Sequence, residues 1–161
     1  MATRKRNRTS KKFKYFYLDK KLYRVLSSSR AKDQIIAWSY LDQKRVMFIY
    51  SDVIKYMQNA FTLTEVSKIL NKHRVTIQDY MLEGKVRAPQ KAVPIGKPES
   101  EWWAYIFSED DVLELYDFIL SAGRNIEDLP NKRELTALLK NNIILYTKTS
   151  DGKFVPVWKA D

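Results

Sequence analysis

The chain holds few side chains that could perform catalysis. Its 161 residues include no cysteine and one histidine, His73. A zinc site or a two-histidine iron site needs more ligands than this, and no disulfide can form. The sequence also lacks a glycine-rich phosphate loop and a Ser, His and Asp set of catalytic type. It therefore predicts a protein that is not an enzyme, with no cofactor and no metal.

Three consecutive acids, Glu109, Asp110 and Asp111, have the composition of a metal-binding group. They follow Ser108, a residue type that caps helices, and precede an apolar stripe of helical period. Acids in the first turn of a helix are stabilised by the positive end of the helix dipole. We interpret the run as the start of a helix and not as a metal site.

Anion binding is the chemistry that the charges favour. The net charge is +10, and residues 1–14 supply seven of these charges without one acid. The cations are Arg4, Lys5, Arg6, Arg8, Lys11, Lys12 and Lys14. A flexible basic arm gains free energy at a polyanion by releasing condensed counterions, which predicts contact with nucleic acid. A tail that only increases solubility is the alternative.

Further polar and basic side chains lie between residues 72 and 91, on two short predicted helices. Thr62–Glu65 has the spacing of a capping box and predicts a helix that ends near Leu70. A second helix is predicted from Arg74 to Glu83, with Gly84 at its end. Three residues separate the two helices, which is the length expected for a helix-turn-helix.

A loop, a strand and a third helix are predicted after the two helices. Residues 85–101 contain Pro89, Pro94 and Pro98 among several cations and predict a basic loop. A strand is predicted over Trp102–Phe107, and a helix capped by Ser108 should follow it to about Leu120. Helix, turn, helix, basic loop, strand and helix is the order of a winged helix.

The residues of this region carry a family resemblance. Val66–Val86 fits, without a gap, an apolar helix, a turn, Thr-aliphatic-x-x-Tyr and Gly-x-aliphatic. Tyr105–Leu115 is similar to the end of a wing and the entry to the next helix. The region resembles the MerR-like or excisionase-like winged helix-turn-helix family over about 60 of 161 residues. No long heptad helix follows, so the chain resembles the small phage and plasmid members.

The resemblance implies double-stranded DNA as the partner, with the second helix in the major groove and the wing along the backbone. It places the following residues at DNA: His73, Arg74 and Gln78 at base edges or phosphates, Thr76 and Tyr80 near the backbone, Lys72 in the turn, and Arg87 and Lys91 in the wing. Arg can bond guanine through two hydrogen bonds, and Gln can do so with adenine. Asp79 departs from the pattern and would repel phosphate unless it bonds cytosine or pairs with an arginine.

The remaining segments indicate an α+β fold. Four strands are predicted at 13–18, 22–26, 34–40 and 46–50, as an antiparallel meander that is either an open sheet or a small SH3-like barrel, and a short helix at 52–58. A C-terminal helix from Asn131 to Lys140 and a hairpin of 143–148 with 153–158, turning at 150–152, follow the winged helix. The predicted units are the arm 1–12, the meander 13–59, the winged helix-turn-helix 60–122 and the extension 123–161.

Aromatic side chains leave two interpretations open. Trp102, Trp103 and Tyr105 could stack on bases or anchor the wing to the core. The aromatic residues of the meander, with cations at its turns, fit a surface that binds nucleic acid or protein, and they fit a small core equally well.

We expect a DNA-binding protein of a phage or mobile element that acts in transcription control, excision or packaging, as a regulator, an excisionase-like factor or a small terminase-like subunit. The alternative is a virion-associated or protein-interaction module that binds a polymerase, integrase or terminase, which Asp79, Glu99 and Glu101 favour. No apolar run has the length of a membrane span, so no membrane contact is expected. The expected location is the cytoplasm of a prokaryotic host or the virion, and an oligomer is compatible with the sequence.

Overall fold

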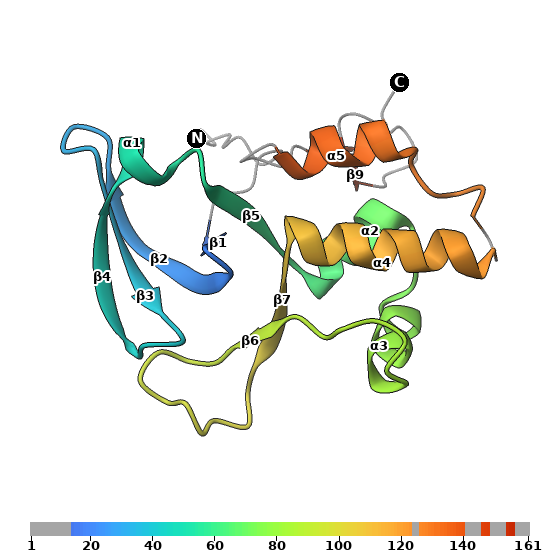
Figure 1. Ribbon diagram of the computed structural model, residues 1–161, viewed down its shortest axis with the longest axis horizontal. Coiled ribbons are helices and arrows are strands. Elements are labelled where there is room, and N and C mark those ends of the chain that lie inside the picture. Colours follow the sequence, from blue (N-terminus) through green and yellow to red (C-terminus); the bar gives the residue numbers. More distant parts are fainter. Residues whose placement is uncertain (1–13, 124–125, 141–145, 149–153, 157–161) are drawn as a thin grey trace, which may run out of the picture.

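The computed structural model describes residues 14–123, 126–140, 146–148 and 154–156. These residues form an α+β fold with one seven-stranded antiparallel sheet, a separate strand pair and five helices (Figure 1). The strand order is β4-β3-β2-β1-β5-β7-β6, with β4 and β6 at the edges. The sheet is therefore open, which decides against the barrel alternative.

The four predicted strands of the meander are confirmed. Their bounds are β1 Tyr15–Leu18, β2 Lys21–Ser29, β3 Gln34–Ser39 and β4 Lys44–Ile49. A two-residue turn joins β1 to β2, and both its residues, Asp19 and Lys20, have positive φ angles of 53° and 64°. Turns of this backbone type match the right-handed twist of antiparallel strands.

The predicted helix over residues 52–58 is wrong. A single turn, α1 Tyr50–Val53, is followed by the strand β5 Met57–Thr62. This strand lies inside the sheet, where Met57 faces Leu18 of β1 and Phe61 faces Phe107 of β7. Hydrogen bonding on both sides of the strand outweighs the helical spacing of Val53, Ile54 and Met57, which is a local preference only.

The remaining helices lie within one or two residues of their predicted bounds. The elements after β5 are α2 Leu63–Leu70, α3 Arg74–Leu82, β6 Gln90–Ala92, β7 Ala104–Ser108, α4 Glu109–Ala122 and α5 Lys132–Lys140. Capping boxes begin α2, through Thr62 and Glu65, and α4, through Ser108 and Asp111. The strand β6 lies inside the segment predicted as a loop. No helix in the described ranges is long and apolar enough to cross a bilayer.

Two short strands near the C-terminal end pair with each other, as predicted for the hairpin. β8 Tyr146–Lys148 pairs antiparallel with β9 Phe154–Pro156. The predicted turn at 150–152 lies outside the described residues.

Helices α2, α4 and α5 lie against β5 and β7, with α3 next to α2, while the meander and α1 extend away from them (Figure 1). The largest apolar cluster joins Phe61 and Phe107 of the sheet to side chains of α2 to α5, including Ile69, Leu115 and Leu135. A second cluster fills the same face of the meander and contains Phe16, Tyr23, Ile35 and Ala37. On the opposite face Tyr17 and Leu22 cluster with Ala92 and Ile106. The sheet is therefore bent enough to bring β1 and β2 against β6 and β7.

Candidate nucleic-acid interface

The turn between α2 and α3 is held by local hydrogen bonds. Asn71 ends α2 in the left-handed conformation, with φ of 55°. The Lys72 N–H donates to the Ser67 carbonyl at 3.0 Å, and the Ser67 hydroxyl donates to the Lys72 carbonyl at 2.7 Å. His73 is the N-cap of α3, and its Nδ1 accepts from the Val75 N–H at 3.2 Å. These contacts fix the direction in which α3 leaves α2.

Three side chains attach α3 to the body of the protein. Ile77 and Met81 are buried in the main cluster, and the partly buried Tyr80 packs edge-on against Phe118, with ring centroids 4.9 Å apart. Tyr80, predicted to touch the DNA backbone, therefore has a packing role in the protein itself. Thr76 is also partly buried.

Solvent covers the other side of α3. Arg74, Gln78 and Leu82 are exposed and four residues apart, so they form one stripe along the helix. Val75 and Leu82 are 53% and 79% exposed. Sequence reasoning did not select these two residues, although both lie off the buried positions Ile77 and Met81. The exposed side of α3 thus presents a cation, an amide and two apolar groups.

Acids accompany these groups. Asp79 is exposed on α3 and, within the described ranges, pairs with neither Arg74 nor Arg87. Glu83, at the end of α3, lies 3.0 Å from the Lys85 ammonium. On its exposed side α3 therefore carries one cation, Arg74, and two acids, of which Glu83 is paired with Lys85.

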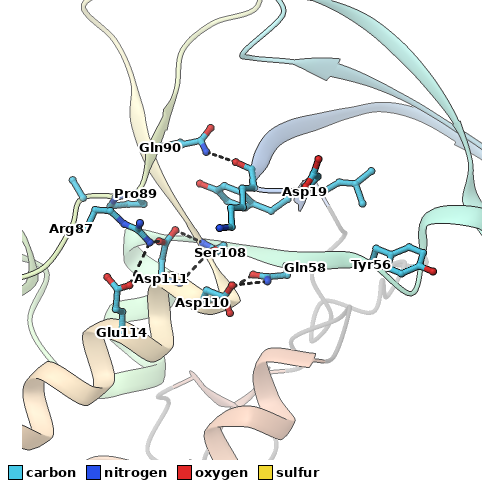
Figure 2. A pocket seen from close by; sticks show the side chains of 14 residues that line it. Asp19, Tyr56, Gln58, Arg87, Pro89, Gln90, Ser108, Asp110, Asp111 and Glu114 are labelled. Atoms are coloured by element: carbon cyan, nitrogen blue, oxygen red, sulfur yellow. Dashed lines mark hydrogen bonds and ion pairs between the residues drawn. The ribbon is translucent and has the colours of Figure 1, made fainter.

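Arg87 was predicted to contact DNA from the wing, but in the structure it lies beside two carboxylates of α4. Its Nη2 lies 3.4 Å from Glu114 Oε2 and 3.7 Å from Asp111 Oδ1, at the first turns of α4 (Figure 2). These carboxylates already compensate the guanidinium charge, which weakens any attraction to phosphate.

Lys91 lies on the hairpin of β6 and β7, over an aromatic pair. Its ammonium is 4.2 Å from the ring centroid of Trp103, and that ring is edge-on to Tyr105 at 4.8 Å. Tyr105 packs against the main cluster, so this part of the hairpin is anchored to the core. Trp102, the residue before Trp103, is 81% exposed, so its ring is accessible for stacking.

A cleft of about 930 Å³ opens behind Arg87, between the β1–β2 turn, the start of β5, residues 87–90 and the first turns of α4 (Figure 2). Its carboxylates are Asp19, Asp110, Asp111 and Glu114. Asp110 accepts from Gln58 Nε2 at 2.9 Å, and Asp111 caps α4. The described residues contain no group of three or more acids or histidines placed to hold a metal ion. The excess of acids makes this cleft unsuitable for a nucleic-acid backbone.

Burial changes the pKa of Tyr17, which lies in the wall of the cleft. The Tyr17 hydroxyl donates to the Ile106 carbonyl, and burial, with the nearby negative charge of Asp111, raises the pKa of this phenol. The residues that line the cleft come from four separate segments of the chain, so no local sequence pattern predicts it.

Comparisons of the chain with protein-family models, curated proteins and solved structures gave no significant match. The structure brings His73, Arg74 and Gln78 together at the exposed side of α3 and places Lys72 in the adjoining turn. Lys91 lies on a separate hairpin, and Arg87 is paired with acids. Arg4, Lys5, Arg6 and Arg8 lie outside the described residues.

Proposed function

We propose that this chain is a non-enzymatic protein that binds double-stranded DNA through α3. The unit would be a winged helix-turn-helix made of α2, α3, the hairpin of β6 and β7, and α4. The observation that carries the proposal is the exposed stripe of Arg74, Gln78 and Leu82 on a short helix whose other side is fixed by Ile77 and Met81. A helix held in this way can enter a major groove as a rigid body.

The side chains of the stripe match the edges of bases. Arg74 can donate two hydrogen bonds to guanine O6 and N7, and Gln78 can bond adenine through N6 and N7. Val75 and Leu82 supply apolar surface of the kind that contacts the methyl group of thymine. Lys91 on the hairpin and the basic residues before β1 would add contacts with phosphate, which position a protein without reading sequence.

The biological role that we propose follows from the resemblance of residues 66–86 to small phage and plasmid regulators. The protein would act as a regulator, an excisionase-like factor or a small terminase-like subunit in a prokaryotic cell. Its partner would be duplex DNA, with no cofactor.

The experiment measures affinity by fluorescence anisotropy for a duplex selected from a random library and for an unselected duplex, over a salt series. We expect Arg74→Ala and Gln78→Ala to weaken binding to the selected duplex by about 10 to 100 fold, because each bidentate base contact contributes about 1–3 kcal/mol. Arg133→Ala removes one exposed cation from α5 and is the matched control. It should change either affinity by less than about twofold. Equal losses for Arg74→Ala and Arg133→Ala would refute base reading by α3.

The exposed apolar groups of α3 also support a second candidate, a module that binds a protein such as a polymerase, integrase or terminase. Val75 and Leu82 lie beside Asp79 and Glu83, and phosphate would repel these two carboxylates whereas a protein partner need not. Absence of duplex binding by the folded chain at low salt would favour this candidate and remove the first.

A further inference from the structure

An alternating row of aromatic and basic side chains crosses the first four strands. Tyr15 of β1 lies opposite Arg24 of β2, Arg24 lies opposite Trp38 of β3, and Trp38 lies opposite Arg45 of β4. Residues directly opposite one another in antiparallel strands point to the same face of the sheet. These four side chains, here called the Tyr15–Arg45 row, therefore share one face.

This face is not the one that holds the core of the meander. Phe16, Tyr23, Ile35 and Ala37 are buried on the other face, next to the row along each strand. Tyr15, Arg24 and Trp38 are partly exposed, and Arg45 is exposed. On the row's own face Tyr15 packs against the cluster of Tyr17 and Leu22, whereas Trp38 belongs to none of the apolar clusters of the described residues, so packing does not account for Trp38.

Contacts within the row already pair cations with rings. The Arg24 guanidinium lies 5.9 Å from the centroid of the Tyr15 ring, and the Lys14 ammonium lies at the same distance from that ring. Within the described part of the chain the indole N–H of Trp38 is buried and finds no hydrogen-bond acceptor. A buried donor without an acceptor is unfavourable, so this N–H adds to the cost of the Trp38 position.

Three acids of the meander have hydrogen bonds or positions away from the row. Asp33 accepts hydrogen bonds from the backbone and hydroxyl of Ser51, and Asp42 bonds Ser39 in the turn before β4. Asp19 lies in the β1–β2 turn, in the cleft. The row itself contains two arginines and no carboxylate. It therefore carries a positive charge that suits a polyanion.

We propose that the Tyr15–Arg45 row binds single-stranded nucleic acid. Bases would stack on Tyr15 and Trp38, which lie two strands and thus about 10 Å apart, far enough to take different bases. Arg24 and Arg45, which alternate with the rings, would meet the phosphates between them. An acidic peptide would use the two arginines but has no need of rings at alternating positions. This second surface goes beyond duplex binding by α3, because it lets one chain hold a duplex beside an unpaired strand.

The test uses the full chain and a fluorescein-labelled strand of twelve thymidines (about 12 nucleotides suits one platform), read by anisotropy at low salt. Trp38→Leu should weaken binding about tenfold, and Trp38→Phe should retain most of it because a ring remains. Arg45→Ala and Lys44→Ala form a matched pair, since both residues are exposed on β4 but point to opposite faces. We expect Arg45→Ala to weaken binding by about three- to tenfold, and Lys44→Ala by less than twofold. Because Arg45 is exposed, this pair remains informative if Trp38→Leu does not fold.

Three further results decide the proposal. A strand of abasic sites with the same length and charge should bind at least fivefold more weakly than the thymidine strand, and equal affinity would overturn base stacking. Stronger binding of polyglutamate than of either strand would overturn the proposal in favour of an acidic protein partner. Arg74→Ala should leave binding of the single strand unchanged, and Arg45→Ala should leave selectivity for duplex sequence unchanged, so failure of one surface is distinguishable from failure of the other.

Discussion

Glu109 joins three elements through one buried carboxylate. The residue is 4% exposed at the first position of α4. Its Oε2 accepts from the Asn59 N–H of β5 at 2.7 Å, and its Oε1 lies 3.2 Å from the Lys140 ammonium of α5. A carboxylate that is both hydrogen-bonded and ion-paired is stable in such a position, whereas the same group without these partners would be costly to bury.

Removal of this carboxylate should destabilise the fold more than removal of its cation. We expect Glu109→Ala to lower the free energy of unfolding by about 2–3 kcal/mol, because the buried Asn59 N–H loses this charged acceptor. Lys140→Ala takes the cation from the buried carboxylate but leaves its hydrogen bond to the Asn59 N–H, and because Lys140 is 68% exposed and screened by water, this variant should cost about 1 kcal/mol. Glu109→Gln keeps an acceptor oxygen and should lie between the two. Urea unfolding measures all three variants, and equal losses for Glu109→Ala and Lys140→Ala would contradict this account.

At the residue scale, the sequence predicted roles that depend on neighbouring residues, such as helix capping, but not contacts between residues far apart in the chain. The interpretation of residues 109–111 as a helix start is confirmed by the capping box of Ser108 and Asp111. The contact of Glu109 with Asn59 joins residues 50 positions apart, and no local spacing encodes it. The same holds for Arg87, whose partners on α4 are known only once the hairpin and α4 are packed together.

At the scale of elements, the backbone conformation of Asn71 ends α2 and begins the turn to α3. Its φ and ψ angles are 55° and 43°, a conformation that costs a side chain other than Asn or Gly about 1–2 kcal/mol. We therefore expect Asn71→Ala to lower the free energy of unfolding by about 1 kcal/mol, and Asn71→Gly to leave it unchanged or raise it slightly. The Asn71 side chain is exposed, so the difference between the two variants reports the backbone. Equal stability of the Ala and Gly variants in urea would show that the left-handed turn does not limit the fold.

Elements with strong local signals were predictable, and elements formed by pairing were not. Capping residues and apolar stripes located α2, α3, α4 and α5, and short runs of apolar and β-prone residues between polar breaks located β1 to β4. The strand β5 was missed, and its first two residues were predicted as the end of a helix, because its pairing with β1 and β7 is not visible in its own residues. β6 was missed because it has three residues in a proline-rich loop, two of them exposed, and exists through its pairing with β7.

At the scale of the whole molecule, one sheet connects segments that the sequence suggested as separate units. β5 crosses the predicted boundary at residues 59 and 60 and pairs with the meander on one side and with β7 on the other. Tyrosines are buried along this sheet and beside it. The predicted meander and helical body should therefore respond together when buried phenols ionise.

Four tyrosines make this response measurable at high pH. Burial raises the pKa of Tyr40 to about 12 and raises the pKa values of Tyr17, Tyr23 and Tyr116 from the ordinary value of 10.0. Above pH 10 the unfolded chain releases these protons while the native chain keeps them, so the native state binds more protons and its stability falls as pH rises. The stabilisation is complete below pH 10 and is lost progressively toward pH 12 and beyond.

We therefore expect the urea midpoint of the natural sequence to fall between pH 10 and pH 12, with one transition for near-ultraviolet and far-ultraviolet circular dichroism. Tyr17→Phe loses its hydrogen bond to the Ile106 carbonyl and should be less stable at neutral pH, but its midpoint should fall less steeply in alkali, because one buried phenol no longer titrates. Tyr56 is 68% exposed, so Tyr56→Phe is the control and should follow the natural sequence at every pH. The same alkaline slope for Tyr17→Phe and Tyr56→Phe would exclude the buried phenol as a cause, and separate transitions for the two probes would show that the sheet does not unfold as one unit.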